Sequence, residues 1–103
     1  MRVEQKEKVL AKLEAHADAL KRFGVKRCGL FGSHVRGQAS GDSDIDILVE
    51  FEPGKKTFDN FMHLAFYLED ILRSKVDLVT VESLSPYIGP YILAEVEYAA
   101  LGA

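Results

Sequence analysis

Two spacings of apolar residues alternate along the chain and predict its helices and strands. In residues 3–23, apolar side chains recur every three or four positions with Lys and Glu between them. This pattern is typical of an amphipathic helix, and Gly24 stands where that helix would end. The same spacing returns over residues 58–73 and predicts a second long helix.

Three shorter apolar runs predict strands over residues 27–31, 45–51 and 75–81. A short helix is expected directly after Ser33, and residues 91–102 are expected to contain a last helix. Helices and strands therefore alternate along the chain. This order predicts an α+β fold in which a small mixed β-sheet is packed with helices.

Length and composition limit the classes of protein to consider. A chain of 103 residues is enough for one modest core, and we expect a single domain over residues 1–103 with its first helix within 1–24. The net charge of −3 argues against strong direct binding of nucleic acid. One cysteine, Cys28, cannot form an internal disulfide, and no secretory or membrane-spanning stretch is found. We therefore expect a cytoplasmic protein with no membrane association.

Two carboxylates stand at the start of an apolar run, where a core would not favour them. Asp44 and Asp46 are one residue apart, so on a strand they would project from the same face, with Cα atoms about 6.5–7 Å apart. Such a pair is repulsive unless it is solvated or shares a cation, and Mg²⁺ prefers carboxylate oxygens together with substrate phosphates. The pair suits a metal–nucleotide complex. A solvated turn is the alternative, because the sequence GDSD is strongly turn-forming.

A Gly-Ser pair precedes these carboxylates and suits an anion. Gly32 and Ser33 follow the first strand, and Ser33 is a good N-cap for the short helix. Glycine lets the backbone approach a ligand closely, and amides at a helix start favour phosphate. A third carboxylate, Asp77, lies between Val76 and Leu78 and would face the opposite way from them, toward the other two aspartates.

The sequence GSHVRGQASGDSDID, with Gly-Ser, ten residues and then Asp-x-Asp, resembles the signature of the DNA polymerase beta-type nucleotidyltransferases. Asp77 resembles the third carboxylate of that superfamily. The short chain, with KVDLVT and an LSPYIGPYIL tail, is similar to the minimal nucleotidyltransferase (MNT) family, and the likeness spans residues 25–98. The resemblance implies the polymerase beta-like nucleotidyltransferase fold.

The resemblance also implies a function. Members of this family are antitoxins of toxin–antitoxin pairs that transfer AMP from ATP to a tyrosine of a HEPN-domain ribonuclease toxin and silence it. It implies a hetero-oligomer with that toxin, ATP as substrate and two Mg²⁺ ions. Gly32, Ser33 and Arg36 would bind the nucleotide, while the catalytic and metal-binding residues would be Asp44, Asp46 and Asp77. His34 departs from the pattern, since many relatives carry Arg directly after Gly-Ser, and Arg36 is the candidate to replace it.

Two other functions remain open at this point. The same fold could neutralise a partner by occlusion, as a binding module without catalysis. Transfer to a small molecule is weaker, because the chain is short for a second substrate-binding domain. The aromatic C-terminal segment with Tyr87, Tyr91 and Tyr98 suits either the core or a protein interface, and we expect about half of it in the core.

Overall fold

The computed structural model describes residues 2–37 and 44–102 and has four strands. Two of them, β1 (Val25–Phe31) and β2 (Ile45–Phe51), are antiparallel neighbours, and β3 (Val76–Thr80) lies parallel to β2. The last strand, β4 (Glu97–Tyr98), is antiparallel to β1, so the sheet order is β3-β2-β1-β4. A mixed sheet with helices confirms the α+β prediction.

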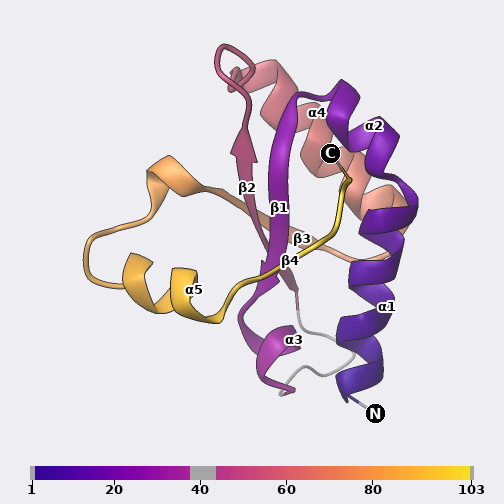
Figure 1. Cartoon of the computed structure of the whole chain (residues 1–103), viewed down its shortest axis with the longest axis vertical. Coiled ribbons are helices and arrows are strands. Elements are labelled where there is room, and N and C mark those ends of the chain that lie inside the picture. Colours follow the sequence, from indigo (N-terminus) through magenta and orange to yellow (C-terminus); the bar gives the residue numbers. More distant parts are fainter. Residues whose placement is uncertain (1, 38–43, 103) are drawn as a thin grey trace.

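The helices lie on both sides of these strands (Figure 1). On one side, α1 (Arg2–Ala15), α2 (Ala17–Arg22) and α4 (Phe58–Leu72) gather against the sheet. On the other side, α5 (Gly89–Glu95) stands apart after the short 3₁₀ helix η1 (Val81–Ser83). The four-residue helix α3 (Ser33–Arg36) follows β1 directly.

The core fills the space between the sheet and the helices α1, α2 and α4. It includes Leu13, Leu20 and Leu68 from the helices, together with inward-facing strand residues such as Ile47. Because side chains alternate along a strand, Asp46 and Leu48 face the opposite side from Ile45 and Ile47. The face of the sheet that is free of α1, α2 and α4 is therefore the face that carries Asp46.

Most of the predicted elements are confirmed, and several details differ. The first helix is broken at His16, whose amide is shared between the carbonyls of Lys12 and Leu13 at 3.2 Å each. Gly24, with φ +86°, ends that region as predicted. The strand predicted at 27–31 begins earlier, at Val25.

Three further expectations are corrected by the structure. Ser33 is the first residue of α3, and Gly32 is the N-cap. The last helix ends at Glu95, because the next residues leave it to pair with Gly29 and Leu30 of β1. The C-terminal tyrosines are exposed, since the core side of the sheet is already filled by three helices.

Candidate active site

Two of the three predicted carboxylates, Asp46 and Asp77, lie side by side at the start of two parallel strands. Asp46 is the second residue of β2 and is paired in register with Asp77, the second residue of β3. Neighbouring strands lie about 4.8 Å apart, so paired residues project from the same face. Asp44 stands one residue before β2 and is exposed. The pairing places Asp77 where the sequence pattern put it, beside Asp46.

The charges of this group act on one another. The pKa of Asp46 is raised, first by partial burial and then by the negative charges of Asp77 and Asp44, while Arg36 opposes the rise. Glu95 adds a smaller contribution that also raises this pKa. Like charges disfavour ionisation of a neighbour, and around Asp46 they outweigh the positive charge of Arg36. A cation placed among these carboxylates would remove that penalty.

The Gly32 turn lies directly against the Asp46 carboxylate. Phe31, the last residue of β1, is paired with Asp46 of β2, so the next residue lies beside the Asp46 side chain. Gly32 has φ +80°, and a Cβ at this position would overlap the Asp46 carboxylate. Only glycine combines this backbone conformation with so close an approach. The turn and Asp46 therefore form one site.

Glu95 is a functional candidate that the sequence pattern did not reveal. Its Oε2 accepts a hydrogen bond of 2.8 Å from the Gly32 amide. Its two carboxylate oxygens also lie 3.0 and 3.1 Å from Nη1 of Arg36. Glu95 is 63 residues from Gly32 along the chain, and no spacing rule connects them. A carboxylate of the protein thus occupies two of the donors that were predicted to hold a phosphate.

His34 does not take part in this anion-binding arrangement. Its side chain is buried, and burial lowers its pKa, so a neutral imidazole is favoured. Within the described part of the chain its Nδ1 has no hydrogen-bond partner. Arg36, in contrast, is exposed and contacts Glu95 at the Gly32 turn. Of these two side chains, Arg36 is therefore the cation at the Gly32 turn, where it is paired with Glu95.

Carboxylates are the ligands that a hard divalent cation takes, but those of this site are not gathered around one point. Among residues 2–37 and 44–102, no three Asp, Glu, His or Cys side chains are close enough together to hold a metal ion. Repulsion among carboxylates keeps such groups apart when no cation is between them. Mg²⁺ needs only one or two carboxylates, with water and phosphate as its other ligands. Asp46 and its register partner Asp77 offer two carboxylates of this kind.

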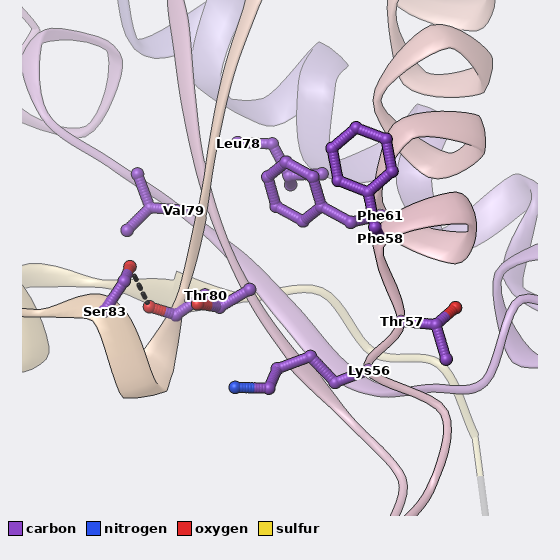
Figure 2. Close-up of a pocket in the computed structure, with 8 residues that line it drawn as sticks. All are labelled: Lys56, Thr57, Phe58, Phe61, Leu78, Val79, Thr80 and Ser83. Carbon is purple, nitrogen blue, oxygen red and sulfur yellow. Dashed lines mark hydrogen bonds between the residues drawn. The ribbon is translucent and has the colours of Figure 1, made fainter.

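A separate cavity of about 350 Å³ lies at the other end of β3 (Figure 2). One part of its wall comes from the start of α4 and the residues just before it, and the other part comes from the end of β3 and from η1. The lining residues are Lys56, Thr57, Phe58, Phe61, Leu78, Val79, Thr80 and Ser83. None of the three carboxylates lines it. The reactive groups of the candidate site are therefore on the sheet face and not in this cavity.

Comparison with known proteins places the chain in a family. The family model described as "Nucleotidyltransferase domain" matches residues 13–99. The chain belongs to this family. It is therefore a nucleotidyltransferase, and the resemblance to polymerase beta-type enzymes is confirmed. In the described residues, no helix is long and apolar enough to cross a membrane.

Individual proteins of this family show which kinds of nucleotidyltransferase the chain is similar to. The chain is 46% identical over 93 residues to protein adenylyltransferase MntA of Thermococcus cleftensis, a match that covers 89% of this chain and 93% of the relative. A solved structure named for the minimal nucleotidyltransferases has a TM-score of 0.71 at 37% identity, covering 85% of this chain and 93% of the other. A toxin–antitoxin structure with AMP-PNP has a TM-score of 0.70 at 26% identity, covering 87% of this chain and 71% of the other.

Proposed function

We propose that this chain is a Mg²⁺-dependent protein adenylyltransferase that transfers AMP from ATP to a tyrosine hydroxyl of a HEPN-domain toxin and thereby neutralises it. The contact between the Gly32 turn and Asp46 carries the proposal, because it joins an anion-binding turn to the carboxylates. The similarity to protein adenylyltransferase MntA supports a protein as the acceptor. The similarity to a toxin–antitoxin structure with AMP-PNP supports ATP as the donor and a complex of two different chains.

The proposed reaction forms one bond and breaks one bond. The tyrosine oxygen attacks the α-phosphorus of ATP, the bond from that phosphorus to the bridging oxygen breaks, and pyrophosphate leaves. Asp77 accepts the hydroxyl proton, and Asp44, Asp46 and Asp77 would hold Mg²⁺. When bound, Mg²⁺ supplies positive charge that stabilises the transferring phosphoryl group and the leaving oxygen. Once Glu95 releases them, Arg36 and the Gly32 amide orient the β- and γ-phosphates together with Ser33.

The test is intact-mass spectrometry of the HEPN-domain protein after incubation with this chain, ATP and Mg²⁺. We expect the acceptor to gain the mass of one or more AMP units, and the gain to disappear with EDTA. The double variant Asp44→Asn/Asp46→Asn should abolish the gain. Asp70→Asn, an exposed carboxylate on α4, is the matched control and should behave like the original chain.

An assay of toxin activity, run beside the mass measurement, separates catalysis from occlusion. If the chain neutralises the toxin with no mass gain, and the double variant neutralises it equally well, then binding alone explains the neutralisation and the proposed reaction is wrong. If the double variant still binds the toxin but no longer neutralises it, transfer of AMP is the mechanism.

A further inference from the structure

An uncharged segment stands beside the candidate active site. Residues 84–93, here called the arm, contain no charged side chain, although 28% of the chain is charged. Four of the seven large hydrophobic side chains found exposed among the described residues lie in this arm: Tyr87 at 83%, Ile88 at 57%, Tyr91 at 77% and Leu93 at 48%. An exposed concentration of this kind is typical of a surface that binds another molecule.

The arm is an ordered surface. Ser85 Oγ accepts hydrogen bonds from the amides of Tyr87 and Ile88 at 3.3 and 3.1 Å. The Gly89 amide donates to the Ser85 carbonyl at 2.8 Å, and Gly89 itself is buried against Leu84. These bonds fix the backbone while the apolar side chains remain exposed. A partner that binds a pre-organised surface pays less conformational entropy.

One face of α5 leads from the arm to the nucleotide site. Ile88, Tyr91 and Glu95 are three and four residues apart, so they share a face of the helix. At one end of this stripe Glu95 bonds to the Gly32 amide, and Gly32 touches Asp46. Tyr91 is one turn away, about 6 Å along the helix axis. A molecule seated on Ile88 and Tyr91 would therefore reach the carboxylates.

The side chains of the arm indicate which kind of molecule would bind to it. Nucleic acid binds through cationic side chains, and the arm has none. Exposed tyrosines and aliphatic side chains are instead the residues enriched at the centres of protein interfaces. In Figure 1, α5 stands apart from the other helices, so a protein can approach it.

We propose that Ile88 and Tyr91, the apolar part of the stripe, are the docking surface for the protein acceptor. The acceptor covers these two side chains with an apolar face that lies next to the tyrosine that receives AMP. The proposal rests on the proposed function for the identity of the acceptor. It adds the surface by which the acceptor is selected and aligned. Glu95, at the end of the same stripe, ties the docked surface to the nucleotide turn.

The test uses a double variant that keeps the helix intact. Ile88→Ser places a favourable residue at the N-cap of α5, and Tyr91→Gln keeps a good helix former within it. We expect affinity for the HEPN-domain protein without ATP, measured by calorimetry, to fall about tenfold or more. In AMP transfer, KM for the acceptor should rise, while kcat at saturating acceptor stays within about twofold and ATP affinity is unchanged.

The matched control is Phe66→Gln, which removes another exposed aromatic side chain, 60% accessible, from α4. It should leave acceptor binding unchanged. Equal losses in the control and the double variant would overturn the proposal, and so would acceptor binding by the double variant at the original strength. A double variant that changes only self-association of this chain would also overturn it, since a second copy would then be the occupant.

The two proposals fail in different ways. If the original chain transfers AMP and the double variant does so with unchanged KM, the docking surface is wrong and the proposed function stands. If the original chain binds the acceptor through the stripe but transfers nothing, docking stands and the proposed function is wrong.

Discussion

At the scale of single residues, the site depends on the absence of one methyl group at position 32. We expect Gly32→Ala to lower AMP transfer about a hundredfold, because the new Cβ would displace the Asp46 carboxylate, and small displacements of catalytic groups are costly. Gly54→Ala is a matched control: Gly54 also has φ +80°, but a Cβ there would meet nothing within 4 Å.

The control separates backbone strain from the loss of the site. Both positions have a positive φ, a strain that costs an alanine about 1–3 kcal/mol, and the ψ of −150° at Gly32 lies in a region that essentially only glycine adopts. Urea denaturation should therefore show both variants destabilised, whereas the transfer assay should show loss only for Gly32→Ala. Full activity of a folded Gly32→Ala chain would contradict the role given to this turn.

The raised pKa of Asp46 predicts how stability depends on pH. The folded chain holds the Asp46 proton to higher pH than the unfolded chain, chiefly because burial and the neighbouring carboxylates disfavour the ionised form. As pH rises from the ordinary range of a carboxyl group through this raised pKa, the unfolded state loses protons first and the folded state is destabilised. Without divalent cations, Asp46→Asn should therefore become increasingly more stable than the original chain.

The measurement is the free energy of unfolding of both chains at several pH values and constant ionic strength. Over that range the difference should grow in favour of Asp46→Asn, although this variant should be inactive in transfer. A constant difference, or one that changes in the opposite direction, would show that the charge of Asp46 is not destabilising in the folded state.

Sequence spacing predicts that Asp46, Asp77 and Gly32 lie near one another, as they do, because each lies at a fixed offset from a strand. It did not reveal the burial of His34, since an imidazole has no characteristic spacing that distinguishes core from surface. It also did not reveal Glu95, because the bonds from Glu95 to Gly32 and Arg36 depend on how the distant arm folds back. Contacts between residues far apart in the chain are set by tertiary packing.

At the scale of elements, β2 has the predicted bounds of 45–51, whereas β4 was predicted as helix. The difference has a physical cause. The alternation in β2 is local and strong, but the two residues of β4 are strand only because they pair with Gly29 and Leu30. A Cβ at Gly29 would lie 2.8 Å from the Glu97 carbonyl oxygen, so this glycine lets the strands approach.

Because β4 begins two residues after Glu95, this pairing helps to position α5 against α3. We expect Glu95→Gln to bind ATP several-fold more tightly, because the carboxylate holds the Gly32 amide and Arg36 and repels phosphate. Calorimetry with an ATP analogue measures the affinity. Glu97→Gln is the matched control: Glu97 pairs with Lys6 at 3.1 Å and should not affect nucleotide affinity. Weaker binding by Glu95→Gln would instead mean that Glu95 holds the turn in its binding shape.

At the scale of the whole molecule, a chain with net charge −3 places Asp46 and Asp77 side by side on its sheet, with Asp44 one residue before β2. This cluster costs stability that a bound cation would restore. A Mg²⁺ concentration ten times its Kd would stabilise the fold by about 1.4 kcal/mol. For a domain of this size, the melting temperature should rise by roughly 5–10 °C. Thermal unfolding followed by circular dichroism checks this, with sodium chloride at equal ionic strength as the control. Asp44→Asn/Asp46→Asn should show no rise specific to Mg²⁺, and an equal rise in both chains would place the ion elsewhere.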